Sequence, residues 1–184
     1  IQSSVFDQFK DNPEEFIVKA AALINDEKAT AVIEHITYDI LDDRYGTDVF
    51  TDPTIKGRLG VNAMKAKKHL YDHIVYDSTG ERDFAAELDT NTNVAVYVKL
   101  PDGFYIATPV GHYNPDWAIA FYEGTVKHIY FVAETKGSMR SMQLRLIEQS
   151  KIHCAREHFK AISGDNVVYD VVDSYQSLLE KVMR

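Results

Sequence analysis

The fold is organised around residues 114–137, whose sequence is NPDWAIAFYEGTVKHIYFVAETKG. Two apolar runs, residues 118–122 and 129–133, are separated by Glu123-Gly124, a pair typical of a tight turn. We therefore expect an antiparallel β-hairpin, with Asp116 just before its first strand and Glu134 directly after its second.

Charged side chains gather where this hairpin begins and ends. Successive side chains of a strand point to opposite faces, so Glu134 and Lys136 share one face and Thr135 points away. Asp116 is then placed across from Glu134. Two carboxylates and one ammonium at a strand end suit a hard divalent cation with a basic group beside it. The expected ligands of Mg²⁺, or of Mn²⁺ as its substitute, are Asp116, Glu134 and the backbone carbonyl of Thr135. The alternative is two ordinary surface acids, which is the commoner role of an acid at a strand end.

The Pro-Asp and Glu-x-Lys motifs also point to a family resemblance. In this order, each on an expected strand, they resemble the signature of the PD-(D/E)xK nucleases. Their flanks, residues 113–118 and 130–137, are similar to the C-terminal endonuclease domain of the restriction (Res) subunit of type III restriction-modification enzymes. Further similar motifs occur along the chain: residues 12–16, residues 76–78 with Glu81 and residues 84–85, residues 98–101, residues 108–111, Glu148 with residues 151–152, Cys154, residues 158–159 and residues 172–175. The resemblance covers most of the chain and is thinnest at residues 42–69.

Composition bounds the class of protein. At 184 residues with 45% hydrophobic side chains, the chain is long enough to bury a core of its own. No apolar run approaches the length of a membrane span, and the single Cys154 excludes an internal disulfide. We expect a cytoplasmic protein without membrane contact. The chain begins at Ile1 rather than Met, and we expect it to be a fragment of a longer protein.

The charge distribution gives a modest signal for nucleic acid. The formal net charge of −8 argues against strong DNA binding by the chain alone. Residues 134–160, however, carry six basic and three acidic side chains, directly after the hairpin. Arg140, Arg145 and Lys151 are the candidates there for phosphate contacts, with His112 beside Asp116 as a further one. A solvated amphipathic helix explains most of these charges equally well.

Periodicity predicts the remaining elements of an α/β fold with a mixed sheet. From Glu81 onward we expect a helix (81–90), strands at 94–100 and 104–107, the hairpin, a helix (138–161) and a strand (167–172), followed by a short helix (174–183). With residues 104–107 counted as a resumption of the strand at 94–100 after a turn, this is the α-β-β-β-α-β order of the PD-(D/E)xK core. We assign residues 71–184 to that domain. Residues 1–70 are expected to form a small α/β appendage or linker, with a helix from Asn12 to about Asn25. Residues 30–41 are expected to form a strand, and a second helix is the alternative that fits them nearly as well.

Two further side chains have open roles. Glu81 lies on the helix before the sheet, where an acid reaches the metal in related nucleases; an acid favoured by the helix dipole is the alternative. Lys136 would sit beside the attacking water, either as a general base or as a cation that stabilises the transition state. An ion pair with Glu134 is the simpler role for Lys136.

The resemblance implies a Mg²⁺-dependent endodeoxyribonuclease, the nuclease part of a type III site-specific deoxyribonuclease that cuts double-stranded DNA. It implies an ATP-dependent helicase motor on the same full-length chain and a modification (Mod) methyltransferase subunit that supplies recognition. The sequence holds no G-x-x-x-x-G-K-[ST] phosphate loop, so ATP would act only through that absent motor. The alternative is a catalytically silent module of the same fold that docks DNA or a partner subunit. A repair nuclease of the same superfamily is a third reading, which the flanking words oppose.

Overall fold

A computed structural model describes residues 9–33, 36–39, 46, 50, 57–126, 130–135, 142–163 and 167–183. The chain divides into two compact units, residues 1–36 and residues 37–184. The division expected from the sequence at residue 70 stays a prediction.

Helix α2 (Pro13–Ile33) is the main element of the first unit. Its start is as expected, because the amide of Glu15 donates to Asn12 Oδ1 at 3.1 Å and the Asn12 amide group donates back to the Glu15 carboxylate at 3.1 Å. Its end is later than expected, and the strand expected from Thr30 is wrong as far as Ile33. No glycine or proline follows Pro13 within the helix to end it, and two alanines in its last turns favour helix. Residues 36–39 form no regular element, and residues 40 and 41 lie outside the described residues.

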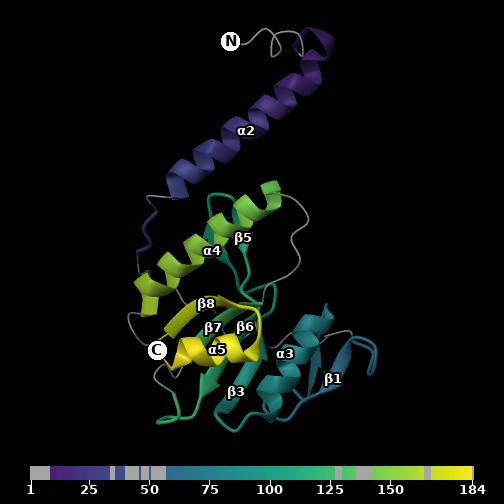
Figure 1. Cartoon of the computed structure of the whole chain (residues 1–184), viewed down its shortest axis with the longest axis vertical. Helices are drawn as coiled ribbons and strands as arrows, with labels where there is room; N and C mark the ends of the chain where they lie inside the picture. The colour runs from purple at the N-terminus through teal and green to yellow at the C-terminus, as the bar shows by residue number, and fades with distance from the viewer. Residues whose placement is uncertain are drawn as a thin grey trace. The chain divides into compact units, whose positions relative to one another are not determined.

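A mixed four-stranded sheet forms the centre of the second unit (Figure 1). Its strands are β3 (Val94–Lys99), β6 (Trp117–Phe121), β7 (Tyr130–Thr135) and β8 (Val167–Val172), in the spatial order β3-β6-β7-β8. The first two pairings are antiparallel and the pairing of β7 with β8 is parallel. The expected hairpin is therefore confirmed as β6 and β7, and the expected mixed α/β class is confirmed with it.

Three helices cover the two faces of this sheet. Helices α3 (Thr79–Thr90) and α5 (Tyr175–Val182) pack on one face, and α4 (Met142–Ser163) packs on the other. Both helices of the first face begin at a serine N-cap: Ser78 Oγ accepts from the amide of Glu81, and Ser174 Oγ accepts from the amide of Ser177, each at 3.2 Å. The helix before the sheet and the last short helix thus lie where the sequence predicts them.

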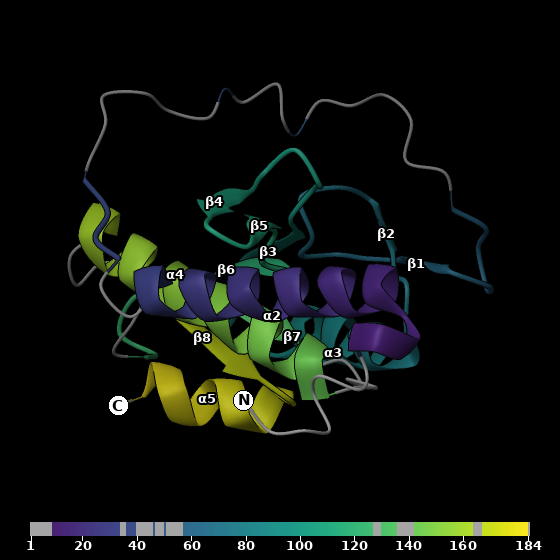
Figure 2. The same ribbon diagram turned by 90° about the horizontal axis from the view of Figure 1, so that it is seen from above.

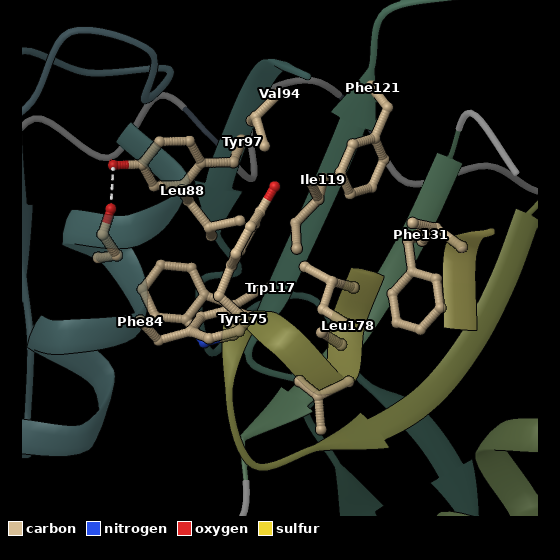
Figure 3. Close-up of a cluster of buried hydrophobic side chains, with 14 of the residues drawn as sticks. Phe84, Leu88, Val94, Tyr97, Trp117, Ile119, Phe121, Phe131, Tyr175 and Leu178 are labelled. Carbon is tan, nitrogen blue, oxygen red and sulfur yellow. Dashed lines mark hydrogen bonds between the residues drawn. The ribbon is translucent and has the colours of Figure 1, made fainter. Parts of the chain in front are cut away.

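The larger core lies between the sheet and helices α3 and α5 (Figure 3). Trp117 is fully buried at its centre, with the Phe84 ring at 5.8 Å and the Tyr97 ring at 6.3 Å between ring centroids. On the other face, Ala155 and Phe159 of α4 pack against a smaller cluster that includes Val132. Ala155 and Phe159 are both buried, and Cys154, next to Ala155 in the sequence, is fully buried, as a small hydrophobic side chain would be.

Two short hairpins lie outside the central sheet. Strands β1 (Ala63–Lys65) and β2 (His73–Val75) form one, and β4 (Ile106–Thr108) and β5 (Gly111–Tyr113) form the other. Figure 2 shows the β4–β5 hairpin on the side of the sheet away from α5. The expectation that residues 104–107 continue the main sheet is therefore wrong. Gly111 has a φ of +106°, which allows the chain to turn back so that β4 pairs with β5 instead.

The strands of the central sheet are thus reached along the chain in the order α3-β3-β6-β7-α4-β8, with the β4–β5 hairpin inserted between β3 and β6. One consequence is that the chain enters β6, and so Asp116, directly from this hairpin.

Candidate active site

Asp116 lies where β6 begins, and its position is fixed by several contacts. The residue before it, Pro115, is fully buried. The side-chain amide of Asn114 donates to the carbonyls of Asp102 and Phe104, each at 2.8 Å, and so fixes the loop that leads into the strand. The carbonyl of Asp116 itself accepts from the amide of Leu100 at 2.8 Å, which holds it against the end of β3.

The carboxylate of Asp116 is held by Thr135 at the end of β7. Its Oδ2 atom accepts from the Thr135 amide at 2.7 Å and also from the Thr135 hydroxyl. Sequence reasoning expected only the carbonyl of Thr135 to take part and missed both of these donors. Neither bond uses Oδ1 of Asp116.

The register of the β6–β7 hairpin bears on the position of Glu134, the second acid expected at the site. Trp117 is the Cα partner of Ala133 in the antiparallel pair. A register continued by one residue would place the backbone of Glu134 opposite Asp116, which is the arrangement expected from the sequence. The side chain of Glu134 lies outside the described residues, and so does all of Lys136. Their roles stay predictions.

Glu81, the acid expected on the helix before the sheet, is half-buried in the first turn of α3. Its Oε2 atom accepts from the amide of Asp77 at 3.1 Å and from Nζ of Lys99 at 2.6 Å. The amide bond resembles that of a capping box, so Glu81 does serve the helix start. Only 16% of its side chain is exposed, however, and Lys99 brings it to the end of β3 beside Asp116.

Lys99 is the functional candidate that sequence reasoning missed. Its Nζ atom lies 2.6 Å from the carboxylates of both Asp77 and Glu81. Burial opposes its charge, but the hydrogen bonds and charges of these two acids outweigh burial and raise the pKa of Lys99. One signal was available in the sequence, because Lys99 is the only charged residue in the apolar run of residues 94–100.

The backbone of Lys99 is fixed from the edge of the sheet. Its amide donates to Nε2 of His69 at 3.1 Å, and the segment around His69 bonds to Tyr97 on both sides. Burial lowers the pKa of His69, against the opposing effects of the Tyr71 carbonyl and of the Asp89 charge. A neutral ring is what the contact needs, since only an unprotonated Nε2 accepts a hydrogen bond.

These side chains form one electrostatic unit, which we call the acid cluster: Asp77, Glu81, Lys99 and Asp116. Burial raises the pKa of Asp116, and the hydrogen bonds from Thr135 oppose this shift. The negative charge of Glu81 raises the pKa of Asp116 further, whereas the positive charge of Lys99 lowers it. The protein therefore keeps three carboxylates and one ammonium at the end of the sheet where the hairpin begins and ends, and the charge of one carboxylate, Glu81, acts on another, Asp116.

A comparison with protein families decides what kind of domain carries this cluster. Residues 67–175 match the family described as "Endonuclease domain". The chain belongs to this family. The match includes every member of the acid cluster and the whole of the central sheet, and it supports a restriction-endonuclease-like domain with nuclease activity. No curated protein and no solved structure matches the chain.

The endonuclease domain presents oxygen donors of the kind that a hard cation requires. Asp116 and Glu81 are carboxylates, and Asp116 Oδ1 takes neither of the hydrogen bonds from Thr135. Among the described side chains, no group of three or more His, Cys, Asp or Glu is arranged to hold a metal ion. The Glu134 carboxylate stands outside that search. The chemistry of Asp116 and Glu81 fits Mg²⁺, and the backbone position of Glu134 fits a third carboxylate.

The expected DNA contacts of the endonuclease domain are only partly described. Lys151 is half-buried on α4, and His112 is exposed on β5 with its ring stacked on Tyr105 at 3.9 Å between centroids. In the part of the chain that the structure describes, neither forms an ion pair with the acid cluster. Arg140 and the side chain of Arg145 lie outside the described residues.

Among the helices of the described residues, none combines the length and the apolar character needed to cross a bilayer.

Proposed function

We propose that this chain is the metal-dependent DNA endonuclease domain of a type III restriction enzyme, and that it hydrolyses phosphodiester bonds of double-stranded DNA. The observation that carries the proposal is the fixed carboxylate of Asp116, held by Thr135 and coupled to the charges of Glu81 and Lys99. Membership of the endonuclease domain family supports the class of reaction, and the acid cluster is the location that we propose for it.

The topology supports the finer assignment to the PD-(D/E)xK nucleases. In this fold a Pro-Asp word begins one strand of a hairpin, and a Glu-x-Lys word ends the next. Here Pro115-Asp116 precedes β6, and Glu134-Thr135 ends β7. The parallel pairing of β7 with β8 across α4 completes a mixed sheet that agrees with the proposal.

Under this proposal, Asp116, Glu134 and the Thr135 carbonyl hold Mg²⁺ or Mn²⁺, with Glu81 as a further ligand directly or through water. The cation supplies Lewis acidity toward the phosphate and makes water a better nucleophile. Thr135 orients Asp116 through its hydrogen bonds. Lys136 takes a proton from the attacking water or stabilises the negative charge that develops on the phosphate.

The proposal also places the chain in a larger assembly. A type III subunit would join this domain to an ATP-dependent helicase motor, and a Mod methyltransferase subunit would choose the DNA sequence, in the cytoplasm. The acidic balance of the chain, −8, fits a nuclease that is delivered to DNA by other parts rather than one that binds DNA tightly itself. Lys151, Arg140, Arg145 and His112 remain the proposed DNA contacts.

The first test is metal binding and DNA nicking in the same samples. Mn²⁺ and Mg²⁺ are titrated by calorimetry into the chain and into its Asp116→Ala and Glu134→Ala variants, and nicking of supercoiled plasmid is assayed in parallel. The matched control is Glu123→Ala, which removes an exposed acid in the turn at the other end of β6. We expect binding and nicking in the wild type and the control, and neither in the two site variants.

The same experiment separates the nuclease from a docking module. Metal binding that is lost in both site variants, but without nicking in the wild type, supports a real site that needs the motor and the Mod subunit to reach DNA. A folded wild type that binds no metal contradicts the catalytic proposal and favours a silent module of the same fold.

A further inference from the structure

The ion pairs of Lys99 are arranged in a way that the nuclease mechanism does not require. Lys99 is on β3, whereas the Glu-x-Lys lysine, Lys136, follows β7. Its ammonium group contacts one oxygen each of Asp77 and Glu81 at 2.6 Å. Only 21% of its side chain is exposed, so this is no ordinary surface ion pair.

The position of Lys99 is fixed by its backbone on two sides. The amide of Lys99 donates to His69 Nε2 at 3.1 Å, and its Cα partner in β6 is Trp117, the residue after Asp116. The next amide, that of Leu100, donates to the Asp116 carbonyl at 2.8 Å. The ammonium group is therefore held at the same end of the sheet as the Asp116 carboxylate, and its charge acts on that carboxylate.

The carboxylate oxygen of Glu81 that contacts Lys99 cannot bind a divalent cation at the same time. Glu81 Oε2 accepts from both Lys99 Nζ and the Asp77 amide. A divalent cation that binds this oxygen has to displace the ammonium group, because two cations cannot share one carboxylate oxygen without strong repulsion. Two ligands that exclude each other at one site lower each other's affinity by the same factor.

We propose that Lys99 is a positioning residue that serves as the internal counter-ion of the acid cluster and competes with the divalent cation for Glu81. This inference rests on the proposed function. In the metal-free protein Lys99 neutralises Glu81 and holds its carboxylate at the end of β3. When the cation arrives, it displaces Lys99 from Glu81, and Asp77 remains as the partner of the ammonium group.

The test is the affinity for the cation alone, measured by calorimetric titration of Mn²⁺ and Ca²⁺ into the 184-residue chain. The coupling between mutually exclusive ligands predicts that Lys99→Met binds at least about fivefold more tightly than the wild type. Lys99→Arg keeps the charge and is expected to bind like the wild type. The double variant Glu81→Gln/Lys99→Met is expected to lose the gain, because the oxygen in competition is no longer charged.

The matched control is Lys65→Met, which changes the net charge equally through an exposed lysine on β1. Its affinity is expected to stay within about twofold of the wild type, because exposed charges are screened by salt. Should Lys99→Met fail to fold, Lys99→Gln provides the same test, since it lacks the charge but still donates a hydrogen bond.

Each outcome separates this inference from the proposed function. An affinity of Lys99→Met equal to or weaker than that of the wild type overturns the inference alone, including the case in which only the melting temperature falls. Absence of cation binding in the wild type and in all variants overturns the proposed function and this inference together.

Discussion

The amide and the hydroxyl of Thr135 both donate to a single oxygen of Asp116, the amide at 2.7 Å. The two residues are 19 positions apart and lie at the beginning and the end of one hairpin. Neither bond uses the other carboxylate oxygen, Asp116 Oδ1. Both bonds oppose the rise in pKa that burial imposes on this carboxylate. Thr135 thus favours the ionised form that a cation ligand requires.

Thr135→Val should weaken the site without disturbing the strand. Valine has nearly the same shape as threonine but has no hydroxyl, so Asp116 keeps only the amide bond. Loss of a partner that orients a metal ligand typically costs about 10- to 100-fold in metal affinity or activity. Mn²⁺ titration and plasmid nicking measure both quantities. Thr135→Ser restores the donor and should behave like the wild type; equal losses in the two variants would contradict the role given to the hydroxyl.

Asp116→Asn should abolish nicking and yet stabilise the fold at neutral pH. Because burial raises the pKa of Asp116, the unfolded chain releases this proton at lower pH than the folded chain does. The ionised carboxylate therefore costs stability above the folded pKa, and the asparagine side chain avoids this cost while its oxygen still accepts from Thr135. A gain of about 1 kcal/mol raises Tm by roughly 2–4 °C in a chain of this size.

Thermal unfolding at several pH values checks this prediction in the absence of metal. The wild type should gain stability relative to Asp116→Asn as the pH falls through the folded pKa of Asp116. A Tm of Asp116→Asn below that of the wild type at pH 7 would show that the charge on Asp116 stabilises the fold.

Stability should fall as the pH drops below about 6.5, the ordinary pKa of histidine. Burial lowers the pKa values of His69 and His158 in the folded protein, so the unfolded chain binds protons first and is favoured by acid. The loss continues until the pH reaches the folded pKa values. The free energy of unfolding, measured with denaturant at several pH values between about 7.5 and 5, gives the slope of stability against pH around the ordinary histidine pKa.

His69→Gln should flatten this slope, because glutamine offers an oxygen to the Lys99 amide and does not titrate. His112→Gln is the control, since His112 is an exposed histidine on β5. If both variants keep the slope of the wild type, His69 does not carry the pH dependence.

Helix α5 should be essential to the fold although the family match ends at Tyr175. Leu178 is fully buried on this helix and faces the central sheet (Figure 3). Leu178→Ala should cost about 2–5 kcal/mol of unfolding free energy, as expected for a large-to-small change in a core. Met183→Ala, at a side chain that is 60% exposed, should cost little. A denaturant titration that finds similar stabilities for both variants would contradict the packing of α5.

Some expectations from the sequence failed where local pattern and local propensity disagree. The alternation at residues 30–41 suggested a strand, but the preceding helix continues through Ile33 because no residue stops it. Residues 104–107 do include strand residues, yet β4 pairs with β5 rather than with the main sheet. Periodicity predicts that a segment is extended but does not choose its partner, which depends on the turn at Gly111.

The sequence by itself determined the hairpin, the serine-capped helices α3 and α5, and the position of Asp116 at the start of β6. These features depend on side-chain alternation, turn residues and N-caps, which act over a few residues and are visible in the chain. Helix α3 is the clearest case, since the sequence predicts a helix at residues 81–90 and the observed helix, Thr79–Thr90, begins at its N-cap Ser78.

Only the tertiary structure decided which charges meet. Lys99 reaches Asp77 and Glu81 across 22 and 18 positions of the chain, and Thr135 reaches Asp116 across 19. The ion pairs of Lys99 form because α3 packs on the face of the sheet beside β3, and the contact of Thr135 with Asp116 depends on the pairing of β6 with β7. Burial then raises the pKa of Asp116, whereas at Lys99 the two acids outweigh the opposing effect of burial and raise the pKa. Both shifts depend on everything packed around a charge and not on its neighbours in sequence.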